Sequence, residues 1–426
     1  MKRAEILPRS GLKSFTPDQE RAADACARVV ARGGAVLVRG YAGTGKSEFI
    51  ASLVESLEDA RLNYAAVCPT GKAAATLRAK GAEAQTIHAF GYIPQVDPRT
   101  KELLGFRRKL DMDLPAQFVL IVDEASMVGP TVLHDLLDLV HPGTMRRALI
   151  LVGDGFQLPP VLSIREQRDF GADFDPLSPA MYAETGTELV EMTGVVRQAA
   201  GNPLLATATA LRTPGAMAPM PDWDHLSVRR VGRDWAETLL VAGGLGNAFM
   251  LTWTNRDRKV LNACAREGRG YKDTVCPSDE LIVLANHKPT GLCNGDDLTV
   301  MDVLGSQNAG GVEVWNLVVR SSYSDTPFSA SVIMDFGKRS FAAARVVAKE
   351  HGDVFGLPLV ADYGYCRTVH KAQGSERDTV YVYAPGGLIP VMGETAAKRW
   401  LYTAITRAKN DAHFGGDGTV AYMLGG

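Results

Sequence analysis

The sequence predicts an α/β protein built on parallel β-sheets that helices cover on both faces. Two observations predict this fold class. Short apolar runs alternate with segments of helical period over residues 17–154, and a second alternating region begins near residue 188. Between the halves of that second region, residues 279–358 change to short strands separated by Asn-Gly, Gly-Gly and Ser-rich turns, which indicates a small β-rich insertion.

The first region begins with a helical segment, PDQERAADACARVVA at 17–31, which follows a Thr-Pro start. An apolar strand, AVLVRG at 35–40, breaks into a Gly-rich turn, after which KSEFIASLVESL at 46–57 returns to helical period. The same alternation continues through YAAVCPT at 64–70, GKAAATLRAKG at 71–81, FVLIVDEAS at 118–126, PTVLHDLLDLV at 130–140 and ALILVGD at 148–154. Continuous apolar strands joined by helices predict a parallel sheet.

Residues 91–115 are too polar and turn-rich for a core segment, so we expect a projecting hairpin there. The second region reads as ELVEMTG at 188–194, NAFMLTWTNRD at 247–257, DTVYVYAP at 378–385 and KRWLYTAITRA at 398–408. The expected organisation is a first domain over 1–187 that carries the hairpin, a second domain over 188–278 and 359–426, and the insertion over 279–358.

Composition limits the classes of protein. At about 150 residues per domain, a chain of 426 residues holds several domains. Its 46 Lys and Arg against 48 Asp and Glu give a net charge of −2, so a polyanion would bind in a local groove. With 46% hydrophobic and 22% charged residues the chain is expected to fold throughout.

Neither a membrane segment nor a metal cage is expected from the sequence. The longest apolar runs are far below the roughly 18 residues that cross a bilayer, and the N-terminal segment has no apolar h-region, so we expect a cytoplasmic protein. The cysteines are scattered without a CxxC pair, and we expect reduced core thiols. They are Cys26, Cys68, Cys264, Cys276, Cys293 and Cys366.

GYAGTGKS at 40–47 matches the P-loop pattern, in the required context between a strand and a helix. Glycines let the backbone amides of such a loop converge on phosphate oxygens, and the helix N-terminus adds partial positive charge. The lysine is expected to reach the β and γ phosphates and the serine hydroxyl to bind Mg²⁺. The predicted nucleotide-binding residues of the loop are Gly40, Gly43, Thr44, Gly45, Lys46 and Ser47.

Two further apolar strands end in polar residues. FVLIVDEAS presents Asp123 to the magnesium shell and Glu124 to polarise an attacking water, a pair that predicts hydrolysis. The alternative is a pair of solvated acids that cap the next helix. ALILVGDGFQ presents Asp154 and Gln157 at the strand end, where parallel sheets bind ligands.

These blocks and several others occur in an order that resembles the superfamily 1 helicases of the 5′→3′ branch. Within that branch the chain is most similar to the Dda-type phage helicases and to the motor core of the RecD group. The resemblance rests on GYAGTGKS at 40–47, CPTGKAA at 68–74, QTIHAF at 85–90, LIVDEAS at 120–126, LVGDGFQLPPV at 151–161, EMTGVVRQ at 191–198, TVHKAQGSE at 368–376 and YTAITRAK at 402–409.

The resemblance implies a P-loop NTPase with two RecA-like domains and an SH3-like insertion, which uses ATP and Mg²⁺. It implies that Gln19 reads adenine, that Gln157 senses the γ-phosphate, and that Arg197 and Arg407 are arginine fingers. Gly374 and Glu376 are expected near the nucleotide. Each arginine alone would equally suit a surface ion pair.

The resemblance also implies a nucleic-acid site on loops at the sheet edges. Its residues are Pro69, Thr70, Gly71, Lys72, Thr86, His88, Thr254, Asn255, Thr368, His370 and Lys371. Hydroxyl, amide and amine groups suit phosphate contacts, although a Thr at a strand end is more often a helix cap. Phe106 is similar to the wedge aromatic of the family's hairpin, where it would stack on the last base pair; the alternative is that it packs the hairpin onto its domain. The basic run Arg107, Arg108 and Lys109 lies beside it.

The expected function is therefore an ATP-dependent DNA helicase that moves 5′→3′ on single-stranded DNA and unwinds forked duplex in DNA replication or recombination. A monomer is expected, with replication or single-strand-binding proteins as candidate partners. Three alternatives stay open: an RNA helicase of the related viral branch, a non-unwinding accessory subunit that uses ATP as a switch, and a ring-forming AAA-type ATPase. A substrate preference on matched DNA and RNA forks separates the first alternative.

Overall fold

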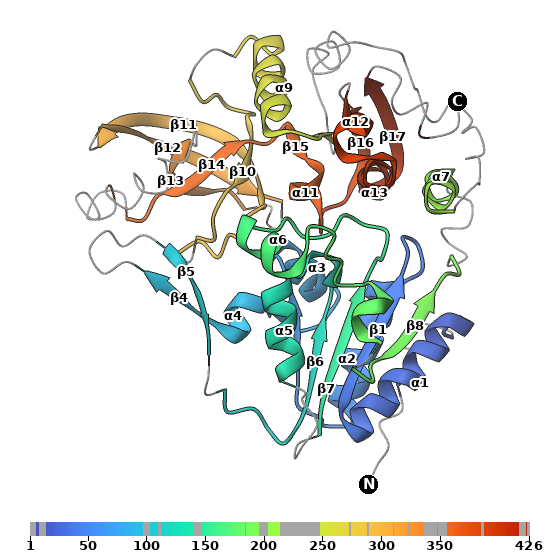
Figure 1. The fold of residues 1–426 in the computed structure, drawn as a ribbon. Helices are drawn as coiled ribbons and strands as arrows, with labels where there is room; N and C mark the ends of the chain where they lie inside the picture. The colour runs from blue at the N-terminus through green and yellow to red at the C-terminus, as the bar shows by residue number, and fades with distance from the viewer. Residues whose placement is uncertain are drawn as a thin grey trace. The chain divides into compact units, whose positions relative to one another are not determined.

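The structure is a computed structural model that describes most of the chain. The described residues are 6–7, 14–96, 103–109, 112–139, 146–183, 185–195, 203–213, 248–271, 274–287, 289–309, 311–322, 324, 326–334, 347, 356–384, 387–416 and 423. The chain divides into two compact units (Figure 1). The first unit is Met1–Gln95 with Gly105–Arg212, and the second is Val96–Leu104 with Thr213–Gly426.

The first unit contains a six-stranded sheet in the order β3-β2-β6-β7-β1-β8, and all its neighbouring strands are parallel. The strands are β1 Gly34–Gly40, β2 Tyr64–Cys68, β3 Ala84–Thr86, β6 Gln117–Val122, β7 Arg146–Gly153 and β8 Glu188–Met192. The predicted α/β fold with parallel sheets is confirmed. Because parallel strands end at one edge, the residues after the neighbouring strands β6, β7 and β1 meet there.

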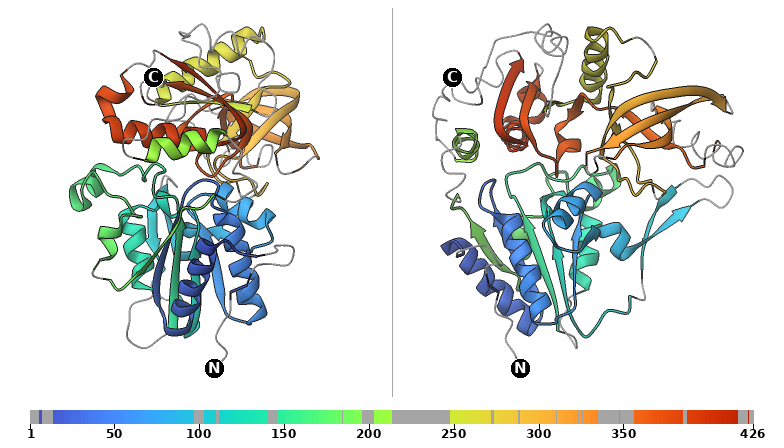
Figure 2. Two further views of the ribbon diagram at one scale, coloured as in Figure 1. Left: turned by 90° about the vertical axis from the view of Figure 1, so that its right-hand side faces the viewer. Right: turned by 180° about the vertical axis from the view of Figure 1, so that it is seen from behind.

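Helices cover both faces of this sheet, as the views from behind and from the side show (Figure 2). The helices of the first unit are α1 Pro17–Arg32, α2 Lys46–Asp59, α3 Gly71–Ala79, α4 Ile87–Gly91, α5 Pro130–Asp138, α6 Ile164–Phe170 and α7 Pro203–Arg212, with 3₁₀ turns η1 Ala125–Met127 and η2 Pro179–Tyr182. The helix α1 starts at a capping box, in which Thr16 accepts from the Gln19 amide and Gln19 accepts from Thr16. This cap fixes where the chain enters the first unit.

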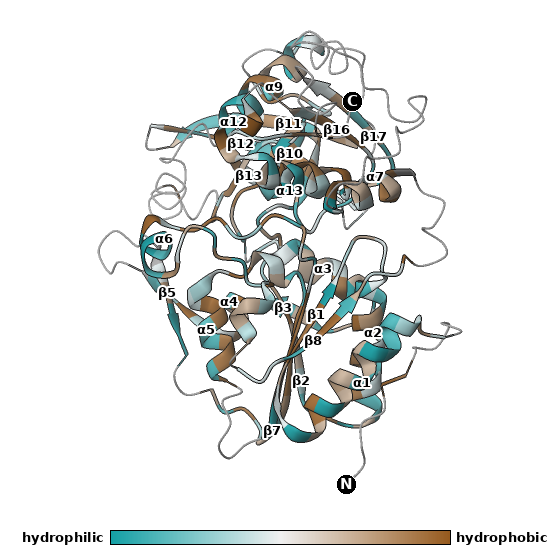
Figure 3. Cartoon of the chain, turned by 45° about the vertical axis from the view of Figure 1, so that its right-hand side comes forward, coloured by the Kyte–Doolittle hydropathy of each residue, from teal (hydrophilic) through white to brown (hydrophobic). Residues whose placement is uncertain are grey.

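Alternate residues of each central strand enter two separate cores. Val36 and Val38 of β1 pack with α1 and α2 on one face, whereas Leu37 packs on the other face with Leu133 and Leu136 of α5. The strands are accordingly apolar on both faces, and the central strands are brown in Figure 3. Burial on both faces explains why the sequence shows continuous apolar runs here.

The structure differs from the predicted domain boundary at residue 188. The strand β8 pairs in parallel with β1, from Val36 opposite Glu188 to Gly40 opposite Met192, so ELVEMTG completes the first sheet. Because β8 is an edge strand that buries little more than Met192, its sequence carries no sign of which sheet it joins.

In the predicted hairpin region, β4 Tyr92–Val96 and β5 Leu103–Arg108 pair as a two-stranded sheet. The base of the hairpin is fixed to the first unit by side chains. Arg108 pairs with Asp135 at 3.2 Å and Asp138 at 2.9 Å on α5, and Tyr92 donates its hydroxyl to Asp135 at 2.6 Å. The hairpin therefore has an anchored base.

The second unit holds a four-stranded parallel sheet in the order β15-β9-β16-β17. Its strands are β9 Ala248–Thr252, β15 Cys366–Thr368, β16 Arg377–Ala384 and β17 Ala408–Gly416. Its helices are α9 Asn255–Gly268, α11 Val369–Ala372, α12 Leu388–Met392 and α13 Glu394–Ile405. The fully buried Trp400 and Tyr402 of α13 belong to the core of this unit.

The predicted β-rich insertion is a closed barrel of five strands. They are β10 Glu280–Val283, β11 Asp297–Ala309, β12 Val312–Ser321, β13 Phe328–Met334 and β14 Leu359–Tyr363. The barrel therefore includes β14, which the sequence had assigned to the parallel-sheet domain. Because all five residues of β14 are buried, its apolar run is equally typical of a barrel strand and of a parallel strand.

Among the described residues, no helix is both long and apolar enough to cross a membrane. All six cysteines are free. Cys26, Cys68 and Cys366 are buried as predicted, whereas Cys264, Cys276 and Cys293 are partly exposed and so are not core thiols.

Candidate nucleotide and nucleic-acid sites

The P-loop follows β1 directly and leads into α2. Gly43 and Gly45 adopt positive φ angles of 78° and 79°, which favour glycine. A Cβ atom at Gly40 would lie 2.8 Å from both the Lys46 Cγ and the Thr44 Oγ1, so the loop closes over a residue without a side chain. The loop therefore has the backbone that a phosphate cradle needs.

Lys46 folds back over the loop. Its Nζ donates to the carbonyl of Tyr41 at 3.0 Å and lies 3.9 Å from Asp154 Oδ2, a carboxylate with no solvent exposure. Thr44 Oγ1 donates to the same carbonyl at 2.8 Å. The loop's ammonium group is thus held at the carboxyl edge of the sheet, beside the end of β7.

Asp123 and Glu124 follow β6 at the same edge. Complete burial, followed by the charge of Glu124, raises the pKa of Asp123 to about 7, while Lys46 and Lys80 act in the opposite direction. Glu124 adopts a left-handed conformation with φ 52°. Within the described part of the chain, no hydrogen-bond partner reaches its buried Oε2. An acid pair in this state favours an added positive charge, and the buried Glu124 Oε2 can accept a hydrogen bond from a water.

A glycine lets the ends of β6 and β7 approach one another. A Cβ atom at Gly153 would lie 3.1 Å from the Ser126 backbone nitrogen and 2.7 Å from Leu177 Cδ1. The turn that follows is fixed by Asp154, which accepts from Phe156 N at 3.0 Å through its side chain and from Gln157 N at 3.2 Å through its carbonyl. This turn buries Gln157, which is 3% exposed.

Gln19 lies against the P-loop. Its Nε2 donates to the carbonyl of Gly45 at 3.4 Å, and its Oε1 accepts from the Thr16 amide at 2.9 Å. The Gln19 side-chain amide thus caps α1 with its oxygen and contacts the P-loop with its nitrogen. The structure thus brings together Gln19, the P-loop residues, Asp123, Glu124 and Gln157 within the first unit.

The helix α7 also packs on the P-loop, which the sequence did not predict. The Arg212 guanidinium lies 3.6 Å from the ring centroid of Tyr41, and Leu205 Cδ1 lies 2.8 Å from where a Gly43 Cβ would be. The sequence of residues 201–228 carries no motif to which a role could be assigned, so it gave no sign of this contact.

The predicted strand-binding threonines are helix caps. Thr70 accepts from the Ala73 amide at 3.2 Å, Thr86 from Ala89 at 3.1 Å, and Thr368 from Lys371 at 3.4 Å. Thr254 accepts from the Asp257 amide at 3.1 Å and donates to its carboxylate at 2.5 Å. The threonine hydroxyls therefore fix the loops at the sheet edges. Apart from Phe106, the other predicted nucleic-acid-binding residues lie in these loops or in the helices that follow them.

In the first unit, this set includes Pro69, Gly71 and the largely buried Lys72 at the start of α3, and His88 in α4. Burial lowers the pKa of His88. Its ring lies 4.5 Å from that of Phe106 and 5.2 Å from that of Tyr92. Phe106, on β5 and 45% exposed, thus joins a predicted strand contact.

The basic run beside Phe106 is partly engaged within the unit. Arg108 pairs with two acids of α5, and Lys109 Nζ donates to the carbonyls of Ala89 at 3.0 Å and Phe90 at 2.8 Å. Arg107 is exposed. The run therefore anchors the hairpin as much as it offers charge to a ligand.

In the second unit, Thr254 and Thr368 follow the neighbouring parallel strands β9 and β15, so both loops lie at one edge. Asn255 accepts from Arg258 Nε at 3.3 Å. His370 and Lys371 belong to α11, and burial lowers the pKa of His370. The predicted second-unit strand contacts therefore share one side of the sheet.

The remaining predicted residues lie in turns of the second unit. Gly374 has φ 75°, and the Glu376 carbonyl accepts from Arg377 Nη1 at 3.0 Å. Arg407 is 4% exposed, and its Nε donates to the Thr403 carbonyl at 3.2 Å. Arg197 lies outside the described residues.

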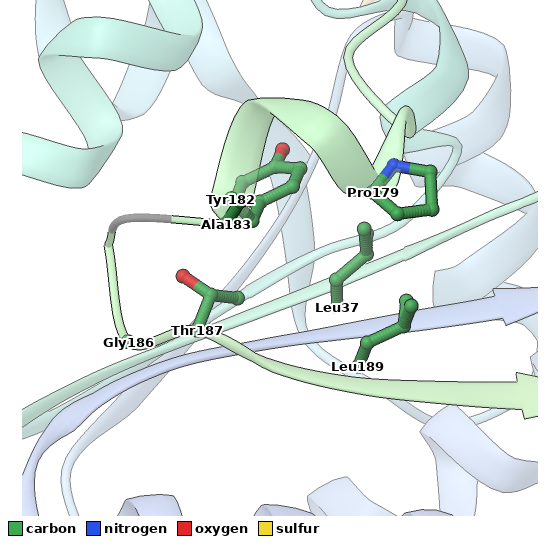
Figure 4. A pocket seen from close by; sticks show the side chains of 7 residues that line it. All are labelled: Leu37, Pro179, Tyr182, Ala183, Gly186, Thr187 and Leu189. Atoms are coloured by element: carbon green, nitrogen blue, oxygen red, sulfur yellow. The ribbon is translucent and has the colours of Figure 1, made fainter.

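A separate hollow of about 210 Å³ lies between β1, β8 and η2 (Figure 4). It is lined by Leu37, Pro179, Tyr182, Ala183, Gly186, Thr187 and Leu189. Its lining has no charged side chain and none of the predicted site residues, so it has none of the groups that a phosphate would need.

Comparisons with known proteins agree with this arrangement. Residues 14–218 match the AAA domain family, and residues 363–414 match the UvrD-like helicase C-terminal domain. Together the two matches cover more than half of the chain. They hold the P-loop with its acid pair and the motifs of α11 and α13.

The RecD2 DNA helicase of Deinococcus radiodurans is 28% identical over 409 residues, which cover 91% of this chain and 48% of the relative. The RecD subunit of the RecBCD enzyme of Mycolicibacterium smegmatis is 27% identical over 429 residues, covering 92% of this chain and 69% of that subunit. The chain is thus similar to helicases of the RecD type along most of its length. It spans about half the length of its RecD2 relative.

Solved structures share this RecD/Pif1-type fold. The Pif1 helicase from Bacteroides in complex with ADP-AlF3 and single-stranded DNA aligns with a TM-score of 0.55 and 17% identity, over 96% of this chain and 94% of that one. A structure of Pif1 helicases at forked double-stranded DNA also gives 0.55, with 18% identity, over 95% and 92%. The chain therefore shares the fold of those structures over most of their length.

Proposed function

We propose that this chain is an ATP-dependent DNA helicase that moves 5′→3′ along single-stranded DNA and unwinds duplex at a fork. The observation that carries the proposal is the group of residues at one sheet edge: Lys46 and the glycines of its loop, Asp123, and Glu124, whose buried Oε2 has no hydrogen-bond partner among the described residues. The D. radiodurans relative is named an ATP-dependent DNA helicase, and the Pif1 structures hold single-stranded or forked DNA.

The P-loop binds the phosphates of ATP. Amides of the loop and the first turn of α2 donate to phosphate oxygens, and Lys46 exchanges the Tyr41 carbonyl for the β and γ phosphates. Gln19, already against Gly45, reads the adenine. Gln157 senses the γ-phosphate from the turn that Asp154 fixes.

Hydrolysis uses the two acids differently. Glu124 orients the attacking water and accepts its proton, because its Oε2 is buried without a partner among the described residues. Ser47 and Asp123 would hold Mg²⁺. Burial, followed by the charge of Glu124, raises the pKa of Asp123, so a cation beside this carboxylate would be favourable. When bound, Mg²⁺ neutralises charge on the phosphate oxygens. Arg197 and Arg407 contribute further positive charge to the transition state, and Gly374 and Glu376 contact the nucleotide.

The DNA strand follows the sheet-edge loops of both units. The loops capped by Thr70, Thr86, Thr254 and Thr368 present amides and small polar groups to the phosphates, with Pro69, Gly71, Lys72, Asn255, His370 and Lys371. The Phe106 ring, in tilted contact with the His88 ring, supports the last unpaired base at the fork. Such contacts are independent of base sequence.

ATP hydrolysis with and without a strand tests this proposal. We expect single-stranded DNA to raise kcat at least about 10-fold, and equal lengths of RNA to raise it less. An ATP hydrolysis rate that neither DNA nor RNA strands change would contradict the proposal. It would favour an accessory subunit that uses ATP as a conformational switch. Preferential stimulation by RNA would instead favour an RNA helicase. Sedimentation of the free protein distinguishes the expected monomer from a ring.

A further inference from the structure

Buried ion pairs join the barrel to the rest of the second unit, and the acid always comes from the barrel. Arg258 of α9 pairs with Asp362 of β14 at 2.6 Å, and Arg266 of α9 pairs with Asp279, just before β10, at 3.1 Å. Asp297, the first residue of β11, pairs with two arginines, Arg367 of β15 and Arg377 of β16. In each pair the barrel supplies the acid, and α9 or the parallel sheet supplies the arginine.

These pairs are shielded from water. No side chain among them is more than 18% exposed, and Asp279 is fully buried. A buried arginine that loses its acid keeps an uncompensated charge, so such pairs hold their partners in one arrangement. The barrel is therefore attached to the rest of the unit at defined polar points, in addition to the apolar core that it shares with α9 and β9.

Asp297 differs from the other two acids because its arginines come from two different strands. The strands β15 and β16 lie on either side of β9. The ring of Phe249 on β9 lies under both guanidinium groups, with its centroid 4.9 Å from Arg367 Cζ and 5.3 Å from Arg377 Cζ. The Asp297 carboxylate is thus linked to residues of three adjacent strands: directly to Arg367 and Arg377, and through both of them to Phe249.

Arg367 is the residue before Thr368, the cap of the turn that carries the proposed strand contacts His370 and Lys371. Its Nε also donates to the carbonyl of Gly364 at 3.3 Å. The Asp297 carboxylate thereby fixes the start of the strand-contact turn.

Arg377 connects Asp297 to the nucleotide side. Its backbone N–H donates to the carbonyl of Arg407 at 2.9 Å, and its Nη1 donates to the carbonyl of Glu376 at 3.0 Å. Arg407 and Glu376 are the residues of this unit proposed to contact ATP. The side chain of Arg377 thus contacts the Glu376 turn, and its backbone contacts the Arg407 turn.

We propose that Asp297 is a positioning residue that couples DNA binding to ATP hydrolysis, by holding the strand-contact turn and the Arg407 turn as one rigid body with the barrel. The inference rests on the proposed function. When single-stranded DNA binds His370 and Lys371, the turn that follows Arg367 shifts. Because Asp297 pairs with both Arg367 and Arg377, the shift reaches Arg377 and the Arg407 turn. Neither Asp279 nor Asp362 is paired in the described structure with an arginine of β15 or β16, so neither can act in this way.

The test compares Asp297→Asn with two matched variants in the full chain. Asp279→Asn breaks another buried arginine pair of the barrel but touches neither turn, and Asp302→Asn changes an exposed acid on the same strand, β11. For each protein we would measure kcat of ATP hydrolysis without strand, kcat at saturating single-stranded DNA, the KM for the strand, and Tm.

We expect Asp297→Asn to lower the strand-saturated kcat about 10-fold, the size of a typical coupling between sites, without changing the rate in the absence of strand. Asp279→Asn should lower Tm and keep the ratio of the two rates, and Asp297→Glu should restore that ratio. An unchanged ratio in Asp297→Asn, or an equal loss in Asp279→Asn, would overturn the inference. A wild-type protein without strand stimulation would contradict the proposed function instead.

Single-arm variants keep the test decisive if Asp297→Asn does not fold. Arg377→Gln leaves Asp297 bound to Arg367, and we expect it to lower the strand-saturated kcat at an unchanged KM. Arg367→Gln should raise the KM for the strand. If both variants change the same parameter by the same factor, the Asp297–Arg367 and Asp297–Arg377 pairs do not act separately and the inference is wrong.

Discussion

The ammonium group of Lys46 lies 3.0 Å from the carbonyl oxygen of Tyr41, inside its own loop. The Tyr41 carbonyl oxygen is a hydrogen-bond acceptor, as a phosphate oxygen is. We therefore expect a nucleotide phosphate to take its place as the partner of Lys46. Asp154 Oδ2, 3.9 Å away on a fully buried side chain, attracts the ammonium group toward the end of β7.

Replacing this lysine separates its phosphate role from strand binding. Lys46→Ala should reduce strand-stimulated ATP hydrolysis about 100-fold or more, because one charge aimed at the transferring phosphate is lost. Binding of single-stranded DNA without nucleotide should persist, as measured by fluorescence anisotropy. Lys398→Ala, on the exposed part of α13, is the control. An equal loss of hydrolysis and of strand binding would argue against a dedicated phosphate role.

Glu124→Gln tests the proposed proton acceptor. The amide keeps the shape but accepts no proton, so kcat should fall by about 100-fold or more while the Kd for ATP stays close to wild type. Binding of a fluorescent ATP analogue and steady-state hydrolysis would be measured on the same preparation. Hydrolysis within a few-fold of wild type would mean that another group activates the water.

Phe106→Ala tests the contact at the fork. Because the residue is 45% exposed and its ring contacts the His88 ring, its loss should reduce duplex separation more than movement along single-stranded DNA. Phe170 on α6 is also 45% exposed and provides a matched control. If Phe106→Ala unwinds at the wild-type rate, its ring merely packs the hairpin onto the unit.

Stability should fall in mild acid because of buried histidines. Burial lowers the pKa of His370, so the folded state takes up a proton less readily than the unfolded state, whose histidine pKa is about 6.5. The contribution is complete above about pH 6.5 and is lost as the pH falls through that value toward the folded pKa. His370→Asn should make the drop in Tm between pH 7 and pH 5.5 smaller; His134→Asn, at a histidine 72% exposed, should not. An unaltered drop in His370→Asn would assign the effect to other groups.

Periodicity and strand-end polarity predicted the sites within the first unit because those signals are local. Lys46, Asp123 and Gln157 each follow an apolar strand, and parallel strands bring such residues to one edge. The strands β8 and β14 were placed in the wrong domains because membership of a sheet depends on pairing, which a five-residue run does not encode.

Charge pairing between distant segments was also invisible in the sequence. Asp297 and Arg377 are 80 residues apart, and nothing in either local pattern relates them. Arg108 looked like part of a free basic run until its partners on α5 were known. Contacts of this kind follow from the fold and not from the motif order.

The measurement that tests the central claim most directly is strand separation on forked substrates with a single 5′ or 3′ tail, in DNA and RNA versions, with ATP and with a non-hydrolysable analogue. The account predicts ATP-dependent unwinding of the DNA substrate with the 5′ tail, and none with the analogue. Unwinding only from the 3′ tail would contradict the proposed direction, and an absence of unwinding by a protein that hydrolyses ATP on DNA would contradict the helicase function itself.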